Sequence, residues 1–227
     1  MTTIRCCDVE TTGIPTPEDK HAIVEFGWCD LTTKPLFVDY PDSVLCHPNR
    51  PIPKAAMAVH HITDAMVADA TGAVGDLSGA DYLAAHNADF EQQFIKSEIP
   101  WICTWKVALR VYPEAESHAL QFLRYELELK ANEIAASPPH RAGPDAYLCA
   151  LLLERMMRDK PEITLDDMVR WSSGHPLLPR CPLFKHKGKK WADVPADYLD
   201  WIVNKPNDVE AYVKANARLE LKRREQS

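Results

Sequence analysis

The carboxylates Asp8 and Glu10 stand two residues apart near the start of the chain. The residues from Ile4 onward are expected to form a strand, and residues two apart in a strand project from the same face. Two carboxylates held side by side repel each other unless a cation lies between them. All-oxygen ligands of this kind suit Mg²⁺ or Mn²⁺ rather than zinc. The pair therefore indicates a divalent metal site, although an Asp-x-Glu pair alone also fits ordinary acids at an exposed strand end.

Small residues follow this pair directly, at Thr11, Thr12 and Gly13. Small side chains and a flexible glycine are expected to end the strand and to leave room for a substrate backbone. Thr11 and Thr12 are therefore candidate substrate-binding residues.

A histidine and an aspartate stand five residues apart later in the chain, at His140 and Asp145. A Pro-Pro pair predicts an extended segment before His140, and Gly143 with Pro144 predicts a helix start with Pro144 in the first helical position. Apolar residues at helical spacing over 148–157 predict that one face of this helix packs on the protein. Asp145 would then be fixed beside a loop imidazole that is able to take a proton from water. The alternative for His140 is a surface loop histidine.

Three acidic segments thus occur in a fixed order, at residues 8–13, 86–91 and 140–145. Together they resemble the motifs of the DEDDh 3′→5′ exonucleases, a group that includes the proofreading subunit of bacterial replicative polymerases, RNase T, oligoribonuclease and exonuclease X. The resemblance runs from about residue 4 to about residue 157, and a C-terminal match makes exonuclease X the best fit within the group. Further matching segments are Asn49–Pro53, His60–Thr63, Trp101–Thr104, Ser117–Leu120, Leu183–Lys190 and Pro195–Trp201.

The resemblance implies an α/β protein with the ribonuclease H-like exonuclease fold, a mixed β-sheet flanked by helices, followed by a small C-terminal module. It also implies two Mg²⁺ or Mn²⁺ ions. Asp8, Glu10 and Asp145 would hold one ion. Asp8 would bridge to a second ion about 3.5–4 Å away, which Glu91 would support directly or through water. His140 would act as the base, and the products would be nucleoside 5′-monophosphates released from a 3′ end.

The middle segment departs from the family pattern His-Asn-Ala-x-Phe-Asp, because its last position is Glu91. Asp89 stands two residues earlier and is the alternative ligand. In a helix the two side chains would point roughly 200° apart, so both cannot serve the site equally. Register with Phe90 favours Glu91, and Asp89 is then expected to be an N-terminal capping acid. The substitution leaves open a weaker or differently metal-dependent enzyme.

Two further residues are candidate substrate contacts. The resemblance suggests that the loop containing His61 borders the substrate strand, with a purely structural loop as the alternative. The adjacent histidines His60 and His61 invite a metal hypothesis, which the absence of further cysteine or histidine partners nearby does not support. Asn87 would either hydrogen-bond near the scissile phosphate or support the end of a strand.

The expected substrate is the 3′ end of DNA, most simply a single-stranded end. A ribonuclease of the same fold is the rival hypothesis, which contact with a 2′-hydroxyl would decide. A third hypothesis is a catalytically weak nucleic-acid-binding module, prompted by Glu91 and by the basic C-terminal segment.

The composition is compatible with these hypotheses without suggesting them. The 227 residues carry a net charge of −7, which is unexpected for a nucleic-acid enzyme, although 185–190 and 222–224 are locally basic. Seven cysteines without a Cys-x-x-Cys pair are expected to be reduced thiols of a cytoplasmic protein. Neither a signal peptide nor an apolar run near 18 residues is evident, so no membrane association is expected.

The chain is expected to divide into an exonuclease domain at 1–160, a short helix and linker at 161–182, and a C-terminal module at 183–227. The basic segment Lys185–Trp191 would either hold phosphates and stack a base or form a solvated hairpin turn. Tyr198, Trp201 and Ile202 are expected in the core of the module. The expected strands are 4–8, 23–30, 43–46, 82–86 and 102–104. The expected helices include 105–111 and a short helix that is capped by Thr164 with Asp167 and ends near residue 171. A final helix at 208–224 is expected to pack by one face on the protein.

Overall fold

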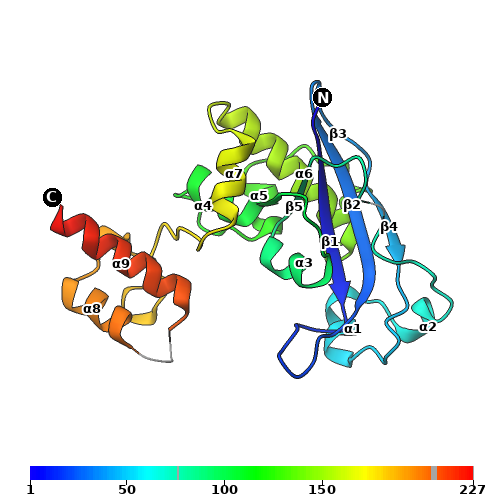
Figure 1. The fold of residues 1–227 in the computed structure, drawn as a ribbon, viewed down its shortest axis with the longest axis horizontal. Helices are drawn as coiled ribbons and strands as arrows, with labels where there is room; N and C mark the ends of the chain where they lie inside the picture. Colours follow the sequence, from blue (N-terminus) through cyan, green and yellow to red (C-terminus); the bar gives the residue numbers. More distant parts are fainter. Residues whose placement is uncertain (76, 206–208, 227) are drawn as a thin grey trace.

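A mixed β-sheet forms the centre of the computed structural model, which describes residues 1–75, 77–205 and 209–226 (Figure 1). The strand order is β3-β2-β1-β5-β6, and β4 also pairs with β2. The neighbours of β2 are antiparallel to it, whereas β1, β5 and β6 run parallel, which confirms the predicted mixed sheet. The strands are β1 Thr3–Thr11, β2 Ile23–Thr33, β3 Leu36–Val38, β4 Asp42–Leu45, β5 Tyr82–Ala85 and β6 Trp101–Cys103.

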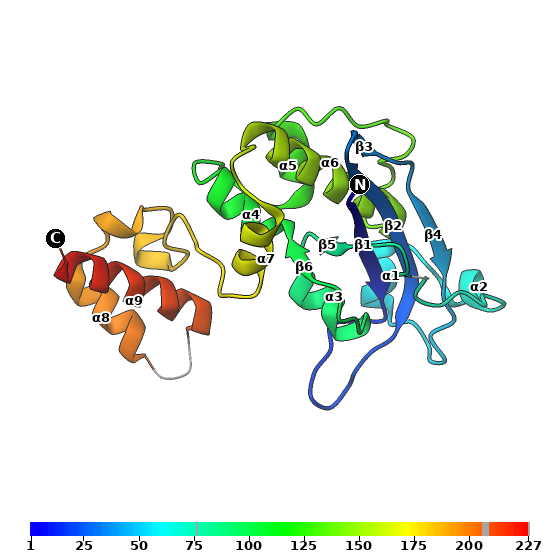
Figure 2. The ribbon, with the colours of Figure 1, turned by 45° about the horizontal axis from the view of Figure 1, so that its top comes forward.

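Helices flank this sheet and form the C-terminal part of the chain (Figures 1 and 2). The longest, α6, packs along β1 and β2, and α7 packs against β6. Within the described residues, no helix combines the length and the apolar character needed to cross a membrane. The helices are α1 Lys54–His60, α2 Asp64–Val67, α3 Ala88–Phe94, α4 Thr104–Val111, α5 Leu120–Glu126, α6 Ala142–Asp159, α7 Leu165–Ser172, α8 Ala196–Asn204 and α9 Ala211–Glu225, with 3₁₀ turns η1 Phe184–His186 and η2 Trp191–Asp193.

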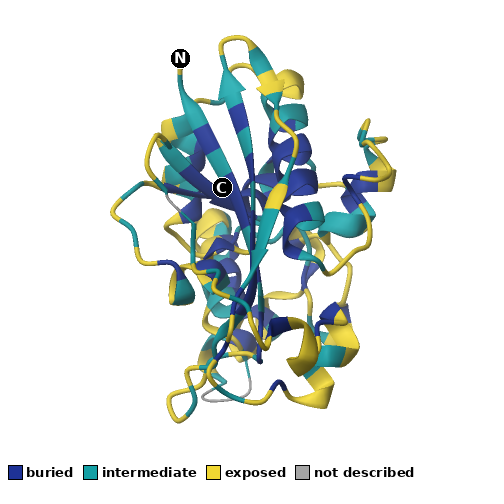
Figure 3. Ribbon diagram, turned by 90° about the vertical axis from the view of Figure 1, so that its right-hand side faces the viewer, coloured by how far each residue is buried: buried dark blue, intermediate teal, exposed yellow. Residues whose placement is uncertain are grey.

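The central strand β1 is buried on both faces by alternating side chains. Ile4 and Cys6 join the apolar cluster beneath α6, whereas Cys7 and Val9 join the cluster on the opposite face. Because side chains alternate along a strand, Asp8 shares the face of Ile4 and Cys6. The strand therefore carries its carboxylates on the face that α6 covers, beyond the last apolar residue. Figure 3 shows how burial is concentrated on the strands and on the helix beside them.

Gly27 on β2 allows the start of α6 to touch the sheet. It is the strand partner of Asp8. A Cβ at Gly27 would lie 2.1 Å from the carbonyl carbon of Ala142 and 2.3 Å from the backbone nitrogen of Gly143, distances that no side chain can occupy. The first turn of α6 therefore lies directly against the strand that borders Asp8.

Several predicted boundaries differ from the structure. β1 continues to Thr11, three residues beyond the expected end, and β3 was not expected. The helix α6 begins at Ala142 rather than at Pro144, and Pro144 lies in the first turn, where its missing N–H needs no partner. The reason is remote in sequence, because the backbone N–H of Ala142 donates to the Glu25 carboxylate at 3.0 Å. The capping pair of Thr164 and Asp167 on α7 is confirmed.

The C-terminal part of the chain, from residue 178 onward, has an apolar cluster of its own, between α8, α9 and the segment that precedes them. Figures 1 and 2 place it beside α4 and α7, away from β1 to β4. Leu178 packs against this cluster and Cys181 belongs to it, although both fall in the predicted linker. The division into 1–160, 161–182 and 183–227 remains a prediction. The buried members are Cys181, Trp191, Val194, Leu199, Ile202, Val213 and Ala217.

Two predictions about this region have different outcomes. Ile202 is fully buried as expected, but Trp201 is 45% exposed, because its ring stacks on Tyr198 at the surface instead of entering the core. The final helix packs by one face as predicted, with Val213 and Ala217 buried. Its expected first residue, Asp208, lies outside the described residues, and α9 itself begins at Ala211.

Candidate active site

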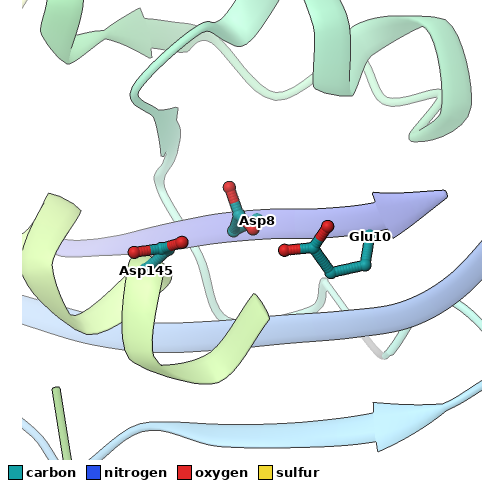
Figure 4. A group of neighbouring side chains, drawn as sticks. All are labelled: Asp8, Glu10 and Asp145. Atoms are coloured by element: carbon teal, nitrogen blue, oxygen red, sulfur yellow. The ribbon is translucent and has the colours of Figure 1, made fainter. Parts of the chain in front are cut away.

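Three carboxylates meet where β1 passes the first turn of α6. Asp8, Glu10 and Asp145 each offer an oxygen, and these oxygens lie within 4.8 Å of one another. Figure 4 shows the three side chains converging from the strand and from the helix. The sequence prediction that these residues come together is therefore matched by their geometry.

Like charges in a confined space shape the electrostatics of this cluster. Burial and the carboxylates of Glu91, Asp145 and Glu10 raise the pKa of Asp8 well above its usual range. Burial, then Asp145 and Glu25, raises the pKa of Glu10 to about 8. Burial likewise raises the pKa of Asp145, despite the hydrogen bonds that it accepts. A cluster whose members resist ionisation next to one another is stabilised by a cation between them.

Glu91 on α3 is a fourth carboxylate, which is not one of the three converging groups but is near enough to raise the pKa of Asp8. Glu91 is 3% exposed, and its Oε2 has no hydrogen-bond partner in the part of the chain that the structure describes. Burial, together with Asp89 and Glu10, raises the pKa of Glu91 to about 8. Among the charged neighbours of Asp8, Glu91 raises the pKa of Asp8 the most. A buried oxygen without a partner is costly unless a ligand completes it.

Asp89 has a different environment, and the prediction that it caps α3 is wrong. The N-cap of α3 is Asn87, and Asp89 makes no capping hydrogen bond. Its carboxylate pairs with the Lys106 ammonium at 2.8 Å, and Lys106 also donates to the Ser172 carbonyl. This pairing joins residues 17 positions apart, which explains why a local pattern did not indicate it. Asp89 is 61% exposed and already has a partner, whereas Glu91 is buried and one of its two carboxylate oxygens has no partner among the described residues.

A structural ion pair holds the start of α6 beside the cluster. Glu25, the strand partner of Glu10, is 1% exposed and accepts bonds from Arg141 Nε at 2.8 Å and Nη2 at 2.6 Å. The Ser43 hydroxyl donates a further bond to it at 3.0 Å. Burial alone would raise the pKa of Glu25, but the Arg141 guanidinium and the Ala142 N–H bring it below its usual value. Arg141 directly follows His140, so this pair fixes where the histidine loop joins the helix.

His140 and Asp145 are connected through the backbone. The His140 N–H donates to Asp145 Oδ2 at 2.9 Å, and His140 is exposed with a left-handed φ of 59°. The other oxygen of Asp145 accepts a bond from the Gln121 side chain at 2.8 Å. Sequence analysis did not single out Gln121, although it follows directly on the matching segment Ser117–Leu120. Both oxygens of Asp145 are oriented by these bonds, and each retains a lone pair for another partner.

The candidate substrate residues Thr11 and Thr12 are buried and support the turn after β1. The Thr11 hydroxyl donates to the Gly13 carbonyl at 2.8 Å, and Thr12 Oγ1 accepts a bond from the Ala22 N–H at 3.0 Å. Thr12 also lies 3.1 Å from His21 Nδ1. These contacts hold the loop between β1 and β2, and a role in substrate binding remains a prediction.

The remaining candidates lie around the same face. His61 is exposed at the end of α1, with a left-handed φ of 59°, whereas His60 is buried and its Nδ1 accepts the Ile62 N–H. Asn87 is exposed at the N-cap of α3, which carries Glu91. The neighbouring His86 bonds to the His118 carbonyl at 2.8 Å and supports this turn. Contact of His61 and Asn87 with substrate remains a prediction.

The donor set of the cluster fits a hard divalent cation. The three converging groups are carboxylates, and the nearby Glu91 has a buried oxygen that lacks a partner within the described residues. Oxygen donors of this kind suit Mg²⁺ and Mn²⁺, and the set contains neither the sulfur nor the imidazole typical of zinc sites.

Comparison with known proteins assigns this arrangement to a family. Residues 6–153 match the family described as Exonuclease. Exodeoxyribonuclease 10 of Escherichia coli (strain K12) is 32% identical over 213 residues, which cover 88% of this chain and 90% of that protein. This chain belongs to the DEDDh 3′→5′ exonuclease family. It is a 3′→5′ exonuclease, and thus a hydrolase that acts on nucleic acid.

Other DEDDh exonucleases extend the comparison. DNA polymerase III subunit epsilon of Treponema pallidum (strain Nichols) is 30% identical over 167 residues, which cover 66% of this chain and 74% of that protein. Among solved structures, exonuclease X in complex with 5′ overhanging duplex DNA is 32% identical with a TM-score of 0.63, and the match covers 74% of this chain and 99% of that chain. The predicted ribonuclease H-like exonuclease fold is therefore confirmed.

Proposed function

We propose that this DEDDh exonuclease is a metal-dependent exodeoxyribonuclease that releases nucleoside 5′-monophosphates from DNA 3′ ends. The observation that carries the proposal is the convergence of Asp8, Glu10 and Asp145, with the buried carboxylate of Glu91 near enough to raise the pKa of Asp8. DNA as the substrate is supported by the name of the Escherichia coli relative and by the DNA bound in the exonuclease X structure.

Four carboxylates would hold two Mg²⁺ or Mn²⁺ ions. Asp8, Glu10 and Asp145 would bind one ion, and Asp8 with Glu91 would bind the other. When bound, such ions polarise the phosphodiester and stabilise the charge that develops on its oxygens. The protein's own contribution is to fix the carboxylates from two directions, on the central strand β1 and on α6.

His140 would accept the proton of the attacking water. It is exposed to solvent, so water can reach it, and its backbone is tied to Asp145 by a hydrogen bond of 2.9 Å. The ion pair of Arg141 with Glu25 limits the movement of the residue next to it. Thr11, Thr12, His61 and Asn87 would contact the terminal nucleotides.

Matched oligonucleotides test the substrate. DNA and RNA of one sequence, labelled at the 5′ end, are incubated with the enzyme and Mg²⁺ or Mn²⁺. The expected result is progressive shortening from the 3′ end of the DNA, with nucleoside 5′-monophosphates as products. Faster digestion of the RNA would establish the ribonuclease alternative. Binding of DNA without release of any mononucleotide would establish the weak binding module instead.

A further inference from the structure

We infer that an aromatic and basic surface of the C-terminal part binds the single-stranded portion of the nucleic acid whose 3′ end occupies the active site. This inference rests on the proposed function for the identity of the substrate. The surface, called the hairpin surface below, consists of Phe184, Lys185, Lys187, Lys189 and Trp201. It lies outside residues 6–153, which match the exonuclease family.

Positive and negative charges are distributed unevenly between residues 1–177 and the C-terminal part. Residues 178–227 contain eleven Lys and Arg against seven Asp and Glu, whereas residues 1–177 contain fifteen against twenty-six. Residues 180–190 contain five Lys and Arg and no carboxylate. Affinity for a phosphate backbone comes mainly from such cations. The C-terminal part is therefore the basic region of an acidic enzyme.

The cations of the hairpin surface are available to a ligand. Lys185, Lys187 and Lys189 are exposed, and no ion pair joins them to a carboxylate in the described part of the chain. Arg180 and Lys190 differ, because both bind Glu114 of the nuclease core, at 2.7 and 2.8 Å. The basic tail of α9 also differs. Its arginines at 223 and 224 pair with Glu220.

Aromatic rings lie exposed among these lysines. Phe184 is fully exposed, and Trp201 is 45% exposed. The Trp201 ring stacks on Tyr198 with centroids 5.1 Å apart, and Lys185 lies over the other ring of this pair at 5.8 Å. Lys205 lies 5.5 Å from the Trp201 ring. Exposed aromatic faces beside cations form the platform on which unpaired bases stack. A duplex hides its base faces, so these rings favour a single strand.

The backbone holds the hairpin surface in a fixed shape. The Cys181 N–H donates to the Lys189 carbonyl and the Gly188 N–H donates to the Cys181 carbonyl, both at 2.9 Å. Gly188 has a φ of +83°, which glycine adopts without strain. Cys181 is buried in the apolar cluster below. The lysines therefore project from an anchored turn, and their ordering on binding costs less entropy than in a free loop.

A groove lies between the hairpin surface and the segment that leads into α3. It has a volume of about 590 Å³, and its lining includes His86 and Asn87 as well as Lys187 and Gly188. Asn87 is the N-cap residue of α3, the helix that carries Glu91 in its first turn, so one helix contributes both to the groove and to the carboxylates beside Asp8. Glu116 is the carboxylate of its lining. A strand that passes Asn87 on its way from the active site would reach the lysines at the far side.

A charge-neutralising variant tests the inference through substrate length. The change is Lys185→Gln with Lys187→Gln and Lys189→Gln, assayed on single-stranded oligonucleotides of about 4 and about 20 nucleotides. We expect the KM for the long substrate to rise about tenfold or more and its dependence on salt to weaken. The kcat, and both constants for the short substrate, should stay unchanged, because the short strand ends before the hairpin surface.

A matched control separates local contact from total charge. Lys34→Gln with Lys130→Gln and Lys160→Gln changes the charge equally at exposed sites elsewhere. Phe184→Ala tests stacking separately and should weaken binding of the long strand about fivefold or more. Equal effects of the two triple variants would overturn the inference. So would an equal loss on short and long strands, or a long-substrate KM that the hairpin variant leaves unchanged.

Direct binding makes the result independent of catalysis. Fluorescence anisotropy with the Asp8→Asn protein compares single-stranded DNA, single-stranded RNA and blunt duplex, with and without the three lysine changes. The inference requires a loss of affinity that is larger for single strands than for the blunt duplex, and an equal loss for both would overturn it. Failure of the proposed function has a different signature, namely no degradation of DNA by the unmodified enzyme.

Discussion

Glu10 and Glu25 face each other on neighbouring strands, yet their surroundings are opposite in kind. Glu25 accepts bonds from a guanidinium, a backbone N–H and a hydroxyl, and its pKa is lowered. Burial, and then the carboxylates of Asp145 and Glu25, raise the pKa of Glu10 to about 8. A buried acid that is satisfied within the protein stabilises the fold, whereas one that repels its neighbours is kept for a ligand. The comparison separates the structural carboxylate of this site from those that would bind metal.

Asp8→Asn should produce the largest effect on the ligand side of this comparison. Turnover should be abolished, because Asp8 is the carboxylate that would serve both of the proposed ions. Removal of one repelling charge should also raise the Tm of the metal-free protein by about 2–4 °C. Thermal unfolding with and without Mn²⁺ provides the readout, because Mn²⁺ should raise the Tm of the unmodified protein but not of the variant. Retained turnover with an intact Mn²⁺ shift would remove Asp8 from the site.

His140→Ala should reduce kcat by about 10²–10⁴-fold, as the loss of a general base does. The shift of Tm on Mn²⁺ addition should remain, since the imidazole is not one of the converging carboxylates. Single-turnover kinetics across pH measures the effect. A variant with unchanged kcat but a lost Mn²⁺ shift would make His140 a ligand rather than a base.

Glu91→Gln and Asp89→Asn should separate activity from stability. Glu91→Gln should lower kcat/KM by about 10–100-fold, because the second ion loses its support. Asp89→Asn should leave kcat/KM nearly unchanged but cost about 1 kcal/mol in the free energy of unfolding, because Lys106 loses its charged partner. Steady-state kinetics and urea unfolding measure the two effects. The opposite pattern would make Asp89 the metal ligand.

Glu25→Gln should act mainly on stability and cost about 2 kcal/mol in the free energy of unfolding, because Arg141 loses a buried charged partner. The folded state lowers the pKa of Glu25, so its stabilisation is present above pH about 4.3 and is lost as the pH falls below that value. Urea unfolding at pH 7 and at lower pH should therefore show a difference between the two proteins that shrinks on acidification. A difference that grows on acidification would contradict the ion pair.

Local sequence patterns were sufficient for part of this site. Alternation along a strand placed Asp8 and Glu10 on one face, and the helical period placed Asp145 in a first turn. The pairing of Glu25 with Arg141 and of Asp89 with Lys106 joins residues 116 and 17 positions apart, which no local period encodes. The α6 start was misplaced because its N–H partner is one of these remote groups.

The C-terminal part shows a different limit. Helical spacing predicted that Tyr198, Trp201 and Ile202 form one buried face of α8. The apolar cluster contacts only part of this face, which includes Ile202 and Tyr198. Spacing indicates which residues share a side of a helix and not where the neighbouring elements end. Trp201 therefore remains at the surface, stacked on Tyr198, although its period is that of a core residue.

Because Gly27 has no side chain, the first turn of α6 can approach the sheet closely, and this sets the distance of Asp145 from Asp8 and Glu10. Even one methyl group at this position would push the start of α6 away from the sheet, since its carbon would meet Ala142 at 2.1 Å. Asp145 and His140 would shift together, because both are attached to that turn. A substitution on β2 would therefore displace a candidate metal ligand and the candidate base together while leaving both side chains unchanged.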